Sequence, residues 1–104
     1  MDRAELLRRV KSCLQEAYGD RLRSVILYGS EARGTAEPDS DIDFLVLLDG
    51  PVDYWEEVRR IIQLLYPFVL EYGRPIHAKP TNILEYEAQE WPLYQSVHEE
   101  GIPV

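Results

Sequence analysis

Two short motifs in this sequence carry residue types suited to phosphate and metal chemistry. Gly29-Ser30 is followed, ten residues later, by Asp41-Ile42-Asp43. A glycine lets backbone approach a phosphate closely, and a serine hydroxyl with neighbouring N–H groups can donate to phosphate oxygens. Carboxylates at positions i and i+2 of a strand point to one face, where they repel unless a cation lies between them or one is protonated. The pair is therefore a candidate Mg²⁺ site, because Mg²⁺ prefers oxygen ligands and keeps positions for water and phosphate.

Apolar segments on either side of the motifs predict the strands that position them. One apolar run leads into Gly29 and a second follows Asp43. We expect strands at about Ser24–Tyr28 and Asp41–Leu48, with a loop or short helix over residues 29–40. Alternation along the second strand would turn Ile42 and Phe44 to the core and both aspartates to the other face.

Amphipathic patterns predict two long helices. Asp2, with Glu5 three residues later, resembles a capping arrangement, and Gly19 is expected to end the first helix. The second helix carries an apolar stripe that we expect to pack in the core, formed by Trp55, Val58, Ile62, Leu65 and Val69. Pro67 removes a helical hydrogen bond, so a kink or a stop close to it is expected.

The remaining segments complete an α/β pattern. Arg74–Lys79 reads as a third strand, with Pro75 at its beginning or marking an edge. Thr81 is expected to cap a short helix that runs to about Ala88, and Pro92 begins a last helical segment that Gly101 ends. The order predicts one small α/β domain over residues 1–104, with helices packed on a mixed sheet.

Composition limits the classes of function. No segment approaches eighteen consecutive apolar residues, and the charged N-terminus lacks the apolar centre of a signal peptide. Cys13 is the single cysteine, so an internal disulfide is excluded, and this is consistent with the reducing environment of the cytoplasm. A net charge of −8 argues against direct binding of nucleic acid and favours a basic protein or a metal-bridged anionic ligand. Self-association stays open.

The segments Gly29–Gly34 and Ser40–Asp43 together resemble the minimal nucleotidyltransferases of the DNA polymerase beta superfamily, in particular the antitoxin-type partners of helical HEPN proteins. The resemblance implies a polymerase-beta-like nucleotidyltransferase fold. It also implies Mg²⁺-dependent transfer of a nucleoside monophosphate, expected to be AMP from ATP, onto a protein acceptor such as a HEPN toxin. Gly29 and Ser30 would then grip the triphosphate, Arg33 and Gly34 would shape the phosphate loop, and Asp41 and Asp43 would be the catalytic metal ligands.

One position departs from the family pattern. Active members usually carry a third carboxylate on the next strand, and the aligned residue here is His77. Neutral histidine can act as a base near neutral pH but is a poorer Mg²⁺ ligand than a carboxylate. Glu71 is the nearest acidic alternative, at an expected helix end. Two functions therefore compete: an enzyme that uses His77 in catalysis, and an inactive module of the same fold that neutralises a HEPN partner by contact. A drug-modifying nucleotidyltransferase is a less favoured third alternative, because it would carry a second domain in addition to the one expected here.

Overall fold

The computed structural model describes all residues 1–104 and forms a four-stranded mixed sheet with helices on both faces. The strand order is β3-β2-β1-β4, in which β1 runs antiparallel to both β2 and β4, and β2 runs parallel to β3. The elements in chain order are α1 (Arg3–Tyr18), a 3-10 turn (Gly19–Arg21), β1 (Leu22–Tyr28), α2 (Ser30–Arg33), β2 (Ile42–Leu48), α3 (Tyr54–Tyr72), β3 (Ile76–Asn82), α4 (Ile83–Glu87), α5 (Pro92–Glu100) and β4 (Ile102–Pro103). The predicted α/β class and mixed sheet are confirmed.

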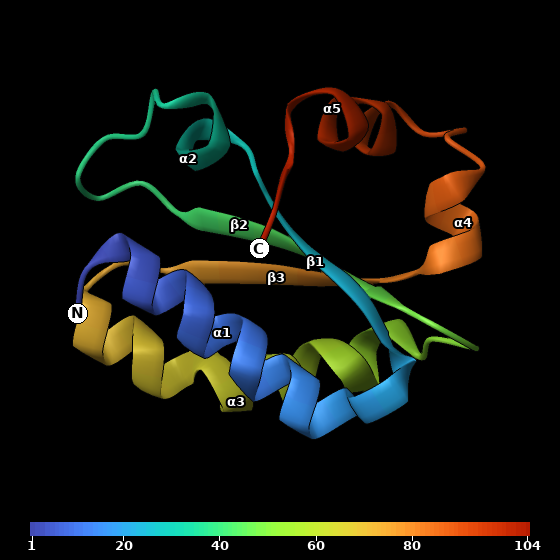
Figure 1. The fold of residues 1–104 in the computed structure, drawn as a ribbon, viewed down its shortest axis with the longest axis horizontal. Coiled ribbons are helices and arrows are strands. Elements are labelled where there is room, and N and C mark those ends of the chain that lie inside the picture. Colours follow the sequence, from blue (N-terminus) through green and yellow to red (C-terminus); the bar gives the residue numbers. More distant parts are fainter.

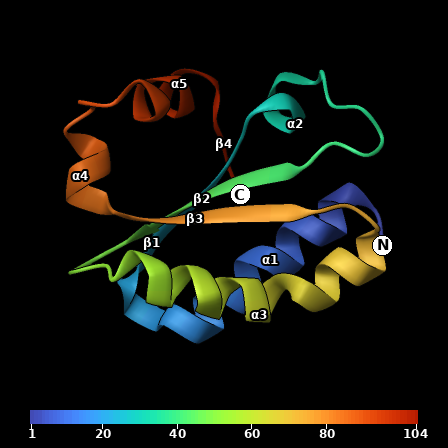
Figure 2. The same cartoon turned by 180° about the vertical axis from the view of Figure 1, so that it is seen from behind.

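The two faces of the sheet carry different helices. The long helices α1 and α3 cover one face, whereas α2, α4 and α5 lie on the other (Figures 1 and 2). Side chains of β2 alternate between these layers: Ile42 and Phe44 join the larger core against α1 and α3, while Leu45 and Leu47 join a smaller core under α4 and α5. The predicted inward orientation of Ile42 and Phe44 is confirmed, and Asp43 consequently belongs to the face of the shorter helices.

Helix α1 forms as its sequence predicts. The Asp2 side chain accepts a hydrogen bond of 2.8 Å from the Glu5 backbone N–H, and Gly19 is the C-terminal cap. Its buried positions recur at helical spacing and are Leu6, Val10, Leu14 and Tyr18. No helix of the structure combines the length and apolar character needed to cross a membrane.

Helix α3 differs from the sequence prediction in two respects, its length and its buried face. It continues past Pro67 to Tyr72, so an early stop there is wrong. Both Pro67 and the residue four positions before it, Gln63, are exposed, so water can satisfy the carbonyl that the proline leaves unpaired. The predicted core stripe is also wrong in part, because Leu65 is buried while Trp55 and Ile62 are 67% and 59% exposed. The buried face instead carries Glu57, Ile61 and Leu65.

The C-terminal elements differ from their expected bounds. Strand β3 begins at Ile76, two residues later than predicted, and runs past Lys79 to Asn82, so that it includes Pro80. A proline is tolerated there because β3 is an edge strand of the sheet. Asn82 rather than Thr81 caps α4, since the Asn82 side chain accepts a hydrogen bond of 2.8 Å from the Leu84 N–H. Strand β4 was not predicted; its two residues pair with Ile26 and Leu27 of β1.

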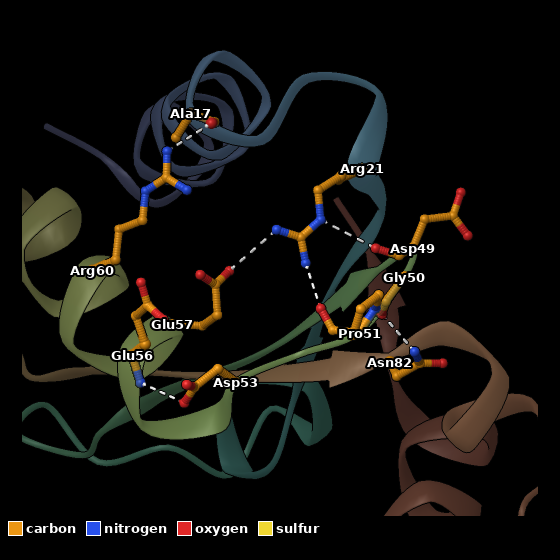
Figure 3. A network of polar contacts seen from close by, with 10 residues as sticks. All are labelled: Ala17, Arg21, Asp49, Gly50, Pro51, Asp53, Glu56, Glu57, Arg60 and Asn82. Carbon is orange, nitrogen blue, oxygen red and sulfur yellow. Dashed lines mark hydrogen bonds and ion pairs between the residues drawn. The ribbon is translucent and has the colours of Figure 1, made fainter.

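A polar network fixes the end of the sheet that lies away from the aspartate pair (Figure 3). The Arg21 guanidinium donates to the backbone oxygens of Asp49 and Pro51, at 3.1 and 2.9 Å, and lies 3.9 Å from the carboxylate of the buried Glu57. The Asn82 amide donates to the Gly50 carbonyl across the same turn. These contacts tie the β2–α3 turn to the segment before β1 and to the end of β3, and so fix the C-terminal end of β2.

Candidate functional site

The turn after β1 lies directly against the aspartate pair. Tyr28, the last residue of β1, is paired in register with Asp43 of β2. The next residue, Gly29, has φ +75°, and a Cβ built on it would lie 2.7 Å from Asp43 Oδ2. Glycine is therefore required here both for the backbone conformation and for the space beside the carboxylate. The structure brings the two predicted motifs into contact.

The two aspartates and His77 gather at the N-terminal ends of β2 and β3. Asp43 is paired in register with His77, and His77 Nε2 lies 3.2 Å from Asp41 Oδ2. All three residues line one open cavity of about 580 Å³. The structure thus places His77 beside the pair, on the strand where the resemblance predicted a third carboxylate.

The two carboxylates differ in environment. Partial burial raises the pKa of Asp43, and the neighbouring Asp41 charge raises it further, while His77 and Arg33 oppose the shift. Asp41 is exposed and pairs with His77. Asp43 is therefore a partly desolvated carboxylate beside a second negative charge, an arrangement that a bound cation would relieve.

The residues fit a divalent cation only as part of a larger ligand set. No group of three or more His, Cys, Asp or Glu side chains is arranged to hold a metal ion. Asp41 and Asp43 can supply two hard oxygen donors, which suit Mg²⁺ when phosphate oxygens and water complete its shell.

The predicted phosphate loop is a short helix held by a partly buried ion pair. Ser30 begins α2, and Gly34 caps it. Glu31, whose side chain is 12% exposed, pairs with Arg74 at 2.8 Å and with Arg3 at 3.1 Å. Arg74 also donates to the Ser40 carbonyl at 2.9 Å, beside Asp41. One guanidinium therefore fixes both the phosphate loop and the approach to the aspartates.

Sequence reasoning assigned no role to the Glu31–Arg74 pair. The two residues are 43 positions apart, and neither stands in a pattern that predicts the contact. Arg33, by contrast, was expected to shape the phosphate loop, and it lies at the end of α2 with its guanidinium 3.3 Å from the Glu100 carboxylate of α5. A phosphate would have to compete with Glu100 for this exposed arginine.

Further residues of the cavity were also missed. Tyr28, Tyr54 and Lys79 line it together with the aspartates. Burial, reinforced by the charge of Asp43, raises the pKa of Tyr28 to about 12, so its hydroxyl stays protonated at neutral pH. Lys79 follows His77 by two residues on β3, so both side chains project from the same face of the strand. Periodicity alone could have grouped Lys79 with His77, but not Tyr54.

Comparison with known proteins agrees with this geometry. The nucleotidyltransferase domain family matches residues 7–104. A Methanocaldococcus jannaschii protein named as a candidate protein adenylyltransferase is 32% identical over 102 residues, covering 97% of this chain and 96% of its own length.

Two solved structures share the fold. A toxin–antitoxin structure with AMP-PNP gives a TM-score of 0.61 at 20% identity, over 92% of this chain and 69% of that one. A mutant of the toxin–antitoxin pair MntA–HpeT gives a TM-score of 0.58 at 18% identity, over 100% of this chain and 72% of that one. The chain belongs to the nucleotidyltransferase domain family and is a minimal nucleotidyltransferase domain.

Proposed function

We propose that residues 1–104 act as one nucleotidyltransferase domain that transfers AMP from ATP to a hydroxyl group of a protein partner. The observation that carries the proposal is the contact between the Gly29 turn and Asp43, with Asp41 and His77 beside them. This contact supports a site in which the Gly29 turn would bind phosphate and the two aspartates would supply oxygen ligands within the span of one triphosphate. The name of the M. jannaschii relative and the AMP-PNP in a structure of the same fold also favour ATP.

The reaction assigns a role to each group at the site. The acceptor oxygen forms a bond to the α-phosphorus while the bond from that phosphorus to the bridging oxygen breaks and pyrophosphate leaves. Gly29 and Ser30 hold the departing phosphates by their N–H groups and the serine hydroxyl. Arg33, once released from Glu100, adds a cation to the phosphate loop that Gly34 ends. Neutral His77 takes the proton from the acceptor hydroxyl.

A divalent cation, expected to be Mg²⁺, would supply charge neutralisation between the triphosphate and the two carboxylates when bound. Asp41 and Asp43 are the residues that would hold it. The raised pKa of Asp43 supports this role, because a carboxylate destabilised by burial and by a like charge gains from a neighbouring cation.

A protein acceptor is supported by the exposed face of α3. Four large apolar side chains project from it at helical spacing: Trp55, Ile62, Tyr66 and Leu70, each more than half exposed. The cavity at the aspartates extends to this helix, because it is also lined by Val58, Ile62 and Val69. A HEPN-type helical toxin that packed against α3 could therefore present a side chain at the Asp pair, in line with the toxin–antitoxin structures of the same fold.

A contact-only antitoxin is the second candidate function. It is favoured by the absence of a third acidic ligand beside the pair, where His77 Nε2 instead lies 3.2 Å from Asp41 Oδ2. Such a protein would use the same α3 face without turnover.

One assay separates the two functions. The chain is mixed with Mg²⁺, ATP labelled at the α-phosphate and the helical protein encoded beside it. If the chain is an enzyme, the partner should become labelled. The label should disappear with Asp41→Ala/Asp43→Ala and should be strongly reduced with His77→Ala. Leu70→Asp is the matched surface control, because Leu70 belongs to the exposed α3 face but does not line the cavity at the aspartates: it should abolish transfer to the partner while ATP binding persists. A tight complex that never acquires label and is unaffected by the double substitution would instead establish the contact-only antitoxin.

A further inference from the structure

A second cavity adjoins the aspartate site on the outer side of β3. It measures about 500 Å³ and shares Tyr54 and Lys79 with the cavity that contains the aspartates. Its other walls come from the end of β3, from α4 and from the beginning of α5. A ligand can therefore extend from the Asp pair past Lys79 into this second space.

The floor of the cavity holds an unsatisfied polar group. Thr81 is only 3% exposed, and its Oγ1 has no hydrogen-bond partner. The Tyr94 hydroxyl lies beside Thr81 and interacts with it without forming a full hydrogen bond, while it donates its own proton to Glu85 at 3.3 Å. A buried hydroxyl without a partner costs free energy, and a ligand atom that pairs with it would recover that cost.

The residues that line this second cavity are suited to bind a flat ligand ring with polar edges. Trp91 and Tyr54 line the cavity and are 58% and 38% exposed, so their rings remain available for stacking. Glu85 adds an acceptor at the rim. Aromatic faces combined with a few hydrogen-bonding groups are the usual means of holding a nucleobase.

The position of the cavity matches the shape of a nucleotide. Thr81 lies four residues beyond His77 on β3, roughly 13 Å along the strand at about 3.3 Å per residue. Lys79 lies midway and projects from the same face, where it can meet a ribose or an α-phosphate. The phosphate turn lies on the opposite side of the Asp pair, on β1. A triphosphate bound there would direct its nucleoside toward β3.

From these features we infer that the cavity under α4 and α5 is the nucleobase site, with the base stacked on Trp91 and hydrogen-bonded by Thr81. This inference rests on the proposed function, because it assumes that the triphosphate lies at Gly29 and the Asp pair. It assigns base recognition to the end of β3 and to the residue that precedes α5, segments that the phosphate and metal motifs do not include.

The test compares Mg²⁺–ATP with Mg²⁺–tripolyphosphate, which has the phosphates but no base, by calorimetric titration of the whole chain. The inference predicts that ATP binds at least about tenfold more tightly. Thr81→Val should weaken ATP about tenfold, and Trp91→Ala about tenfold to a hundredfold, with tripolyphosphate affinity unchanged for both. Tyr66→Ala, which removes an exposed aromatic ring of α3 outside the cavity, is the matched control and should change neither.

Fluorescence gives an independent readout. Trp55→Phe leaves Trp91 as the single tryptophan, and its emission should change on addition of ATP but not of tripolyphosphate. Equal affinities for the two ligands, or Thr81→Val and Trp91→Ala variants that bind ATP like the wild type, would overturn the base site alone. Failure of tripolyphosphate to bind, with ATP binding that still depends on Trp91, would overturn the phosphate site of the proposed function instead.

Discussion

Replacing Gly29 with alanine tests the contact on which the site depends. Gly29 has φ +75° and ψ −154°, a region of backbone space that essentially only glycine occupies, at a cost of about 1–3 kcal/mol for other residues. The new Cβ would also lie 2.7 Å from Asp43 Oδ2, which would force that side chain off its rotamer for about 1 kcal/mol more. We therefore expect a loss of about 2–4 kcal/mol in the free energy of unfolding.

Gly73→Ala is the matched control, because Gly73 also has a positive φ, of +84°, but nothing lies within 4 Å of the position that its Cβ would occupy. It should cost about 1–2 kcal/mol for the left-handed backbone alone. Urea unfolding gives both values. A double-mutant cycle with Asp43→Ala then isolates the clash, since removal of the carboxylate should recover about 1 kcal/mol in the Gly29→Ala background.

The same variant should lose nucleotide affinity. We expect Mg²⁺–ATP to raise the melting temperature of the wild type by mass action, and displacement of the Asp43 carboxylate should abolish that rise. The reasoning is refuted if Gly29→Ala costs no more than Gly73→Ala, adds simply to Asp43→Ala, and still shows the full thermal shift with Mg²⁺–ATP.

Three further variants test other parts of the structure. Because the pKa of Asp43 is raised in the fold, the folded state binds its proton more tightly than the unfolded state, so stability without ligand should fall as pH rises from the ordinary aspartate pKa through the raised one. Asp43→Asn should remove that slope in urea titrations at several pH values and be more stable at pH 7; an unchanged slope would exclude Asp43 as its source. Arg74→Ala, which leaves the partly buried Glu31 with Arg3 as its remaining ion-pair partner, should cost about 2 kcal/mol and weaken Mg²⁺–ATP binding, whereas Arg3→Ala at the half-exposed partner should cost under about 1 kcal/mol. Pro67→Ala should raise stability by about 1–3 kcal/mol, because an exposed helix interior regains a hydrogen bond, and a lower midpoint in urea would contradict this explanation.

Local signals predicted the parts of the fold that depend on neighbours in sequence. The Asp2 cap, Gly19 and the alternation of β2 could all be read from short windows, and so could the juxtaposition of Gly29 with the Asp pair. The failures come from long-range choices. Helix α3 has apolar residues on more than one face, and only packing against the sheet decides that Ile61 is buried while Ile62 is exposed.

For the candidate site, too, the sequence predicted the local motifs but not the contacts between distant segments. Its backbone turn and carboxylates belong to recognisable motifs. His77 could be located because it aligns with the position on the next strand where the family usually carries a third carboxylate. The Glu31–Arg74 pair and the cavity around Thr81 form only when α2, β3 and α5 come together, so no window of the sequence contains them.

The alternation along β2 has a consequence for how this protein can tolerate changes of length. Because neighbouring residues of β2 face opposite sides, loss of a single residue between Asp41 and Phe44 would turn a carboxylate toward α1 and α3 and a large apolar side chain toward the Gly29 turn. The segment from Thr35 to Pro38 lies outside any helix or strand and can absorb insertions without that reversal. Divergent relatives should therefore vary in the length of this loop while the spacing from Asp41 into β2 stays fixed.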